Sequence, residues 1–216
     1  MKLVKLGVPI GLHYFIEVFI FSIGGIMIGW TGAVNLAAHQ IVYSLTTFTF
    51  MISAGLGTAA TIRISIFKGQ KNYAAIGQGA LASLRLVLIF MGTMSVLFVL
   101  LKDILPKLFI IDSEVVAVAA NLIIIASLFQ IFDGIQIVTL GVLRGIGDVN
   151  VPALVACITY LMLSIPVGCF FAFVLEMGAA GIWMGYLAGF IVVSVFLFAR
   201  LRWVYERRYG CGIFGR

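Results

Sequence analysis

Long apolar segments alternate with short polar breaks along the chain. An α-helix rises about 1.5 Å per residue, so roughly 20 apolar residues cross the hydrocarbon core of a bilayer. Segments of at least that length cover residues 8–30, 36–62, 81–101, 115–143, 152–174 and 179–199. The pattern predicts an all-α membrane protein in which residues 1–200 form six transmembrane helices and residues 201–216 a basic cytoplasmic tail.

The polar breaks contain residues that end and start helices. Gly32 and Asn35 follow the first segment, and Gly145 and Gly147 follow the fourth. The break at residues 65–79 differs because it mixes aromatic, basic and polar residues. It predicts either a short amphipathic helix at the membrane surface or an ordinary loop.

The composition excludes a soluble domain. Hydrophobic residues make up 63% of the chain and charged residues 10%, and the mean hydropathy is +1.21. A net charge of +6 is compatible with nucleic-acid binding in a soluble protein. Here the distribution of the charge is explained by orientation in a membrane, so we expect the lipid bilayer as a partner and no nucleic acid.

Lysine and arginine are distributed unevenly between the two sides of the predicted bundle. With a cytoplasmic N-terminus, only Lys102 and Lys107 fall on the outer side. The cytoplasmic side then receives Lys2, Lys5, Arg63, Lys68, Lys71, Arg85, Arg144, Arg200, Arg202, Arg207, Arg208 and Arg216. The positive-inside rule therefore predicts a multi-pass protein of the cell membrane with both termini in the cytoplasm.

Two carboxylates lie near the middle of predicted spans, Glu17 in the first and Asp133 in the fourth. On insertion scales a central Asp costs about 2.5–3.5 kcal/mol, unless it faces the bundle interior, is protonated or binds a cation. We therefore predict that Glu17 and Asp133 couple to a cation or a proton. The alternative is that both only form hydrogen bonds between helices, a role that Asn or Gln would also serve.

Other polar residues accompany the two acids. His13 lies four residues before Glu17 on the same helix face, which places its imidazole within reach of the carboxylate. Gln130 and Gln136 lie three residues on either side of Asp133 and form a polar stripe with it. Both stripes need a polar neighbour or a water-filled cavity.

Further candidates lie at the start of the second span, where His39, Gln40 and Tyr43 could line a cavity. We expect the two histidines to be packing or cavity-lining residues rather than proton carriers. No spacing of His, Cys, Asp or Glu suits a metal, and no nucleophile–base pair or phosphate loop is present. The sequence therefore predicts no enzyme, no metal site and no cofactor apart from a coupling ion.

Hydroxyl side chains are frequent in the second span, and we expect most of them to bond to backbone or to a neighbouring helix. Some could line a cavity. Arg144, next to Gly145, is expected to anchor the following turn or to cap helix carbonyls rather than to bind substrate.

Several local strings together resemble the carboxyl-terminal lobe of the multidrug and toxic compound extrusion (MATE) transporters. The order and spacing of the strings over nearly the whole chain carry this resemblance. They are Leu6-Gly7-Val8-Pro9 followed by Glu17, Leu36-Ala37-Ala38-His39-Gln40-Ile41, Gly55-Leu56-Gly57-Thr58-Ala59-Ala60, Phe132-Asp133-Gly134-Ile135-Gln136, and Gly141-Val142-Leu143-Arg144-Gly145 with Asp148 and Pro152 beyond.

The resemblance implies a secondary antiporter that exports organic cations, including drugs, in exchange for Na⁺ or H⁺. It also implies that the acids matching Glu17 and Asp133 are functional. Transporters of this family have about twelve helices in two lobes, whereas this chain has six predicted spans. A fragment of a longer chain, a separately encoded amino-terminal lobe and a self-pairing half-transporter all explain the difference, and we favour a fragment or truncated product.

Two other functions remain open at this stage. The chain could be a non-transporting membrane subunit or an inert remnant whose acids serve packing only. It could also be a flippase for a lipid-linked substrate, although no Lys or Arg lies in the middle of a predicted span to bind an anionic headgroup. The sequence does not choose between Na⁺ and H⁺ or identify the substrate.

Overall fold

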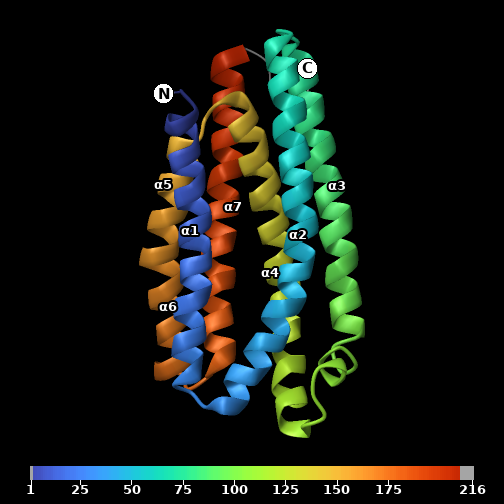
Figure 1. The fold of residues 1–216 in the computed structure, drawn as a ribbon, viewed down its shortest axis with the longest axis vertical. Helices are drawn as coiled ribbons and strands as arrows, with labels where there is room; N and C mark the ends of the chain where they lie inside the picture. Colours follow the sequence, from blue (N-terminus) through green and yellow to red (C-terminus); the bar gives the residue numbers. More distant parts are fainter. Residues whose placement is uncertain (1, 210–216) are drawn as a thin grey trace.

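A computed structural model describes residues 2–209, which form a bundle of long helices (Figure 1). No strand occurs in this part of the chain. The elements are α1 (Lys2–Gly29), α2 (Ala33–Gly69), α3 (Tyr73–Leu100), a 3₁₀ turn η1 (Pro106–Leu108), α4 (Ser113–Ile146), α5 (Asn150–Thr159), η2 (Tyr160–Ser164), α6 (Ile165–Cys169), η3 (Phe170–Val174) and α7 (Ala179–Tyr209).

Six helical stretches are long and apolar enough to cross a membrane. They cover Gly7–Gly29, Ala33–Gly69, Tyr73–Leu100, Ser113–Ile146, Asn150–Val174 and Ala179–Tyr209. The predicted all-α fold with six membrane helices is therefore confirmed. The last helix is longer than the predicted span, so residues 201–209 continue α7 instead of starting a tail, while residues 210–216 lie outside the described residues.

The bundle places α4 at its centre, in contact with α2, α3 and α7. The start of α1 and the end of α7 lie at the same end of the bundle, at the top of Figure 1. The turn between α1 and α2 lies at the opposite end. An even number of spans requires the two termini to share a side, whichever side of the membrane that is.

The predicted surface helix or loop at residues 65–79 is not present. Instead α2 continues to Gly69 and α3 begins at Tyr73, with a turn of three residues between them. The amine of Lys68 donates a 2.5 Å hydrogen bond to the carbonyl of Ile146, which ties the end of α2 to the end of α4. The side chain of Asn72 then accepts from the backbone N–H of Ala75 and caps α3.

The fifth span is an irregular helix built from α5, η2, α6 and η3. Two five-residue π-helical segments, η2 and η3, flank the short α6, which contains Pro166. Proline has no backbone N–H to donate, so the regular α-helical hydrogen bonding is interrupted at Pro166. The wider π turns on either side of α6 accommodate this interruption. The first of these segments carries Tyr160, which is fully buried and turned toward α4.

Helices α2 and α4 approach closely at two glycines. A Cβ built on Gly57 would lie 2.9 Å from the carbonyl oxygen of Ile137, and one built on Gly141 would collide with the carbonyl of Gly57. The hydroxyl of Thr61 donates a 2.9 Å hydrogen bond across the same contact, to the carbonyl of Gly141. Small residues that let two backbones meet are typical of helix contacts in membranes.

We predict that Gly141→Ala lowers the thermal unfolding temperature of the protein in detergent, because the added methyl group forces α2 and α4 apart. Overpacking of this kind costs about 1–3 kcal/mol. Gly92→Ala on α3 is the matched control, since a Cβ at Gly92 meets no atom within 4 Å. Equal unfolding temperatures for the two variants would contradict this account of the α2–α4 contact.

Candidate functional site

A cavity of about 180 Å³, which we call the acid cavity, lies between α1, α2 and α4. Two carboxylates and five aromatic rings line it, and no Lys or Arg is among its lining residues. The lining residues are Tyr14, Glu17, Val18, Phe21, Tyr43, Thr46, Thr47, Phe50, Met51, Phe129 and Asp133. Glu17 and Asp133, which the sequence places 116 positions apart, thus belong to one site.

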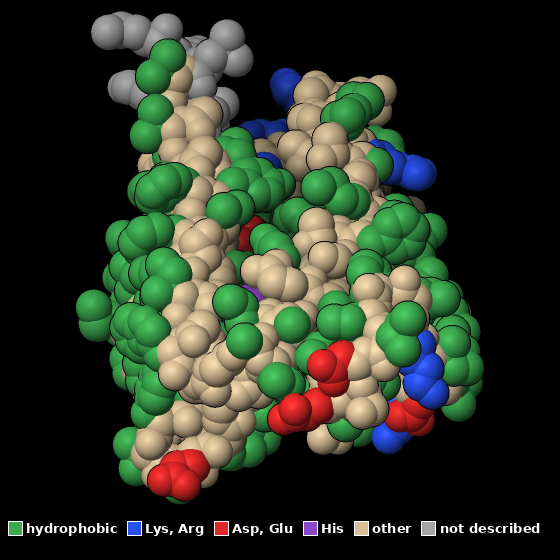
Figure 2. All heavy atoms as spheres, turned by 60° about the horizontal axis from the view of Figure 1, so that its bottom comes forward, with side chains coloured by type: hydrophobic (Ala, Val, Ile, Leu, Met, Phe, Trp, Pro, Cys, Tyr) green, Lys and Arg blue, Asp and Glu red, His purple; other side chains and the backbone are tan. Residues whose placement is uncertain are grey.

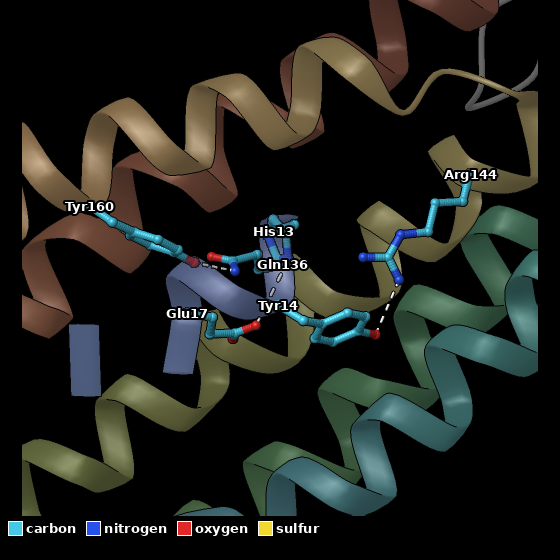
Figure 3. A network of polar contacts seen from close by, with 6 residues as sticks. All are labelled: His13, Tyr14, Glu17, Gln136, Arg144 and Tyr160. Atoms are coloured by element: carbon cyan, nitrogen blue, oxygen red, sulfur yellow. Dashed lines mark hydrogen bonds and ion pairs between the residues drawn. The ribbon is translucent and has the colours of Figure 1, made fainter. Parts of the chain in front are cut away.

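Glu17 is buried beside His13 on α1, as their spacing predicts. The Nδ1 atom of His13 lies 3.9 Å from Oε2 of Glu17, which is longer than a hydrogen bond (Figure 3). Neither ring nitrogen of His13 nor Oε2 of Glu17 has a hydrogen-bond partner among the described residues. Since buried polar atoms are nearly always paired, these unpaired atoms are candidates to bind a proton, an ion or water.

Asp133 lies on α4 with only 4% of its surface exposed. Its neighbours on the polar stripe point to different helices, so only Asp133 of the three lines the cavity. Gln130 accepts a 3.2 Å hydrogen bond from Thr49 on α2. Gln136 donates to the hydroxyl of Tyr160 in the fifth span (Figure 3). The two glutamines therefore fix α4 against its neighbours on either side of the acid.

Among the described residues Arg144 bonds to no helix carbonyl, so the capping role, one of the two expected for it, is wrong. Its guanidinium lies over the ring of Tyr14 at 5.0 Å and donates a 3.1 Å hydrogen bond to the Tyr14 hydroxyl (Figure 3). The carbonyl of Ile146 at the end of α4 is instead bound by Lys68 and Arg208. Because Tyr14 lines the acid cavity, Arg144 places a positive charge just behind its wall.

His39, Gln40 and Tyr43 line a second hollow, of about 380 Å³, between α1 and α2. It shares Phe21 and Tyr43 with the acid cavity, and the centroids of these two rings are 5.4 Å apart. Figure 2 shows a hollow in this side of the molecule in which an acidic and a histidine side chain are visible. The two buried acids therefore line one hollow, and the group of His39, Gln40 and Tyr43 lines the hollow next to it on the same face of the bundle.

Comparison with known proteins identifies the family. The MatE family model matches residues 9–170. The chain belongs to the MATE family. It is 35% identical over 207 residues to a probable multidrug resistance protein NorM of Agrobacterium fabrum, and 36% identical over 201 residues to the NorM of Acinetobacter baylyi. These alignments cover 92% and 93% of this chain but 44% of each relative, so the chain spans less than half of their length.

Solved structures agree at the level of the fold. A MOP superfamily transporter from Pyrococcus furiosus superposes with a TM-score of 0.82 at 24% identity. The match covers 96% of this chain and 45% of that one. The six helices described above therefore form one lobe of a MATE fold.

Sequence reasoning missed several residues of the site, among them Tyr14 and Phe129, which line the cavity, and Tyr160, which bonds to Gln136. Phe129 could have been predicted from the sequence, since it lies four residues before Asp133 and therefore on the same face of α4. Tyr14 and Tyr160 gave no such signal. Their roles depend on Arg144 and Gln136, which are 130 and 24 positions away in the chain.

We predict a graded loss of stability when Tyr14 is altered. Tyr14→Phe removes the acceptor of a charged donor and should cost about 1.5–3 kcal/mol. Tyr14→Leu also removes the ring and should cost about 0.5–2 kcal/mol more. The free energy of unfolding in mixed micelles with SDS measures both. Tyr73→Phe is the control because the Tyr73 ring stacks on Tyr209 and its hydroxyl makes no hydrogen bond to a described residue. Identical values for all variants would refute the contact.

Proposed function

We propose that this chain is one lobe of a secondary antiporter that exports organic cations in exchange for Na⁺ or H⁺. The observation that carries the proposal is the shared cavity of Glu17 and Asp133, whose lining contains two acids, five aromatic rings and no Lys or Arg. The names of the NorM relatives, as probable multidrug resistance proteins, point in the same direction.

The chemistry of the cavity suits a cation that alternates with a proton or a metal ion. Two carboxylates buried at membrane depth are expensive to keep ionised unless a positive charge compensates them. Aromatic rings beside them add cation–π attraction for an organic cation. A proton, a sodium ion and a cationic substrate can each compensate the acids, so each one competes with the others for the same place.

Such competition drives transport only if the two faces of the membrane are reached in turn. A ligand shifts this equilibrium by its differential affinity for the inward and outward states. Exchange of one proton for one monovalent cation moves no net charge, so the ion gradient alone supplies the energy. We propose that the lobe rocks against a second lobe, either an amino-terminal lobe or another copy of this chain.

We predict that Glu17→Gln and Asp133→Asn each reduce the rate of ion-coupled ethidium efflux by a factor of about ten or more, which corresponds to about 1.4 kcal/mol in the barrier to transport. The assay uses vesicles that contain this chain together with an amino-terminal MATE lobe, with a Na⁺ gradient and a pH gradient imposed separately. Asp103→Asn, at an exposed position outside the spans, is the control. Unchanged efflux in both acid variants would overturn the proposed function.

We also propose that the N-terminus and the C-terminus both face the cytoplasm, as the distribution of Lys and Arg predicts. In a variant without native cysteines, Asp103→Cys should react with a membrane-impermeant maleimide added to intact cells. Lys71→Cys, in the turn between α2 and α3, should react only after the membrane is opened. The reverse pattern of labelling would invert the orientation.

A further inference from the structure

Arg85 is a cation on the outer surface of the bundle. It is exposed on α3, which lies at the edge of the bundle in Figure 1. The next residues on the same face, Leu86 and Ile89, are 53% and 71% exposed. Because α3 is long and apolar enough to cross a membrane, this face meets lipid. Arg85 makes no hydrogen bond, ion pair or ring contact with any described residue.

The packing of α3 against α4 fixes the depth of Arg85. A Cβ built on Gly134 would lie 2.6 Å from the side chain of Met91 and 3.0 Å from that of Val87. These residues of α3 are therefore level with the position that follows Asp133. Arg85 precedes Val87 by two residues, about 3 Å along the helix axis. The backbone of Arg85 thus lies at the depth of the hydrocarbon, where an unpaired charge is costly.

No carboxylate of the neighbouring elements compensates Arg85. Helix α3 packs against α2 and α4, and neither α2 nor α3 contains Asp or Glu. Helix α4 contains only Glu114, in its first turn, and Asp133, which lines the acid cavity. Asp103 and Asp112 follow the far end of α3. The charge of Arg85 is therefore left for an anion from outside the described part of the chain.

Arg85 belongs to an apolar groove of about 610 Å³ that runs along α3. The lining residues are Ala82, Arg85, Leu86, Ile89, Phe90, Thr93 and Met94, all from this one helix. From Arg85 to Met94 the groove extends nine residues, about 14 Å. That length is close to one leaflet of a hydrocarbon core about 30 Å thick.

The direction of the Arg85 side chain suits a lipid headgroup. Side chains of a helix lean toward its N-terminus. The guanidinium therefore extends toward the start of α3, which lies at the same end of the bundle as the start of α1 and the end of α7 (Figure 1). Long basic side chains commonly reach the membrane surface in this way. Ala82, the smallest side chain of the groove, lies on that side and adds little bulk there.

We propose that this groove binds one phospholipid with an anionic headgroup. The phosphate accepts hydrogen bonds from the guanidinium of Arg85, a donor group that matches phosphate oxygens in pairs. One acyl chain lies along Leu86, Ile89 and Thr93. A zwitterionic headgroup carries its own cation, so an anionic headgroup compensates Arg85 better. No residue of the groove lines the acid cavity, so the lipid site is independent of the transported substrate.

Competition between two lipids tests the headgroup. The full chain in detergent micelles receives equal amounts of palmitoyl-oleoyl phosphatidylglycerol and the phosphatidylcholine with the same acyl chains. Native mass spectrometry then identifies the first lipid bound. We expect phosphatidylglycerol to be favoured about fivefold, which corresponds to about 1 kcal/mol for one basic residue near an anionic surface.

Three variants assign this preference to Arg85. Arg85→Gln should make the two lipids bind equally, whereas Arg85→Lys keeps the charge and should retain a preference for phosphatidylglycerol. Arg202→Gln is the matched control, because it removes the same charge from an exposed position of α7, where Arg202 is paired with Glu206 at 2.8 Å. It should keep the fivefold preference.

A further pair of variants tests the groove. Thr93→Phe fills the groove and leaves Arg85 in place, so it should weaken binding of the palmitoyl-oleoyl lipid about fivefold. It should not affect dihexanoyl phosphatidylglycerol, whose short chains end before Thr93. Val96→Phe adds the same ring to an exposed position of α3 outside the groove and should bind both lipids as the wild type does.

Three outcomes would overturn the lipid site. The first is a preference for phosphatidylglycerol that survives Arg85→Gln, which would place the anionic lipid elsewhere. The second is an equal loss in Arg85→Gln and Arg202→Gln, which would indicate a diffuse effect of net charge. The third is a dimer that Arg85→Gln dissociates while neither lipid is preferred, which would assign this face of α3 to a second copy of the chain.

Discussion

The close approach of α2 and α4 is the constraint on which the rest of the structure depends. A row of residues four apart on α4, comprising Asp133, Ile137, Gly141 and Gly145, faces α2. The helices touch through backbone at Gly57, where no side chain separates them. Toward Asp133 the facing residues of α2 become larger, and there the acid cavity begins. The contact between the two glycines thus determines how closely α2 and α4 pack and where Asp133 is buried between them.

Buried polar atoms without a partner are concentrated around the site. Buried hydroxyls such as Ser53 and Ser127 bond to the backbone of their own helix, and Asp148 is paired with Arg200 at 2.9 Å. Around Glu17 the pattern reverses, because His13 and Glu17 retain buried atoms without partners. A half-satisfied polar network is unfavourable in a static protein. It is reasonable in one that exchanges ligands, because the ligand completes the network.

Helix number and the two acids could be predicted from the sequence because each depends on local information. Apolar length defines a span, and the spacing of His13 and Glu17 places both on one face of α1. The remainder depends on partners far along the chain. Lys68 extends α2 by reaching Ile146 of α4, which removes the expected surface helix. Arg144 turns to Tyr14 of α1, and the bond from Trp183 to His39 joins residues 144 positions apart.

The central claim is that Glu17 and Asp133 act on one cation as a single site. Equilibrium binding of ethidium to the chain in nanodiscs, measured for the wild type, Glu17→Gln, Asp133→Asn and the double variant, tests it most directly. Groups that share a ligand are energetically coupled, whereas independent sites have additive effects on the free energy. We predict that the double variant weakens binding by less than the product of the two single factors. Factors that multiply, or single variants that bind as the wild type does, would contradict the claim.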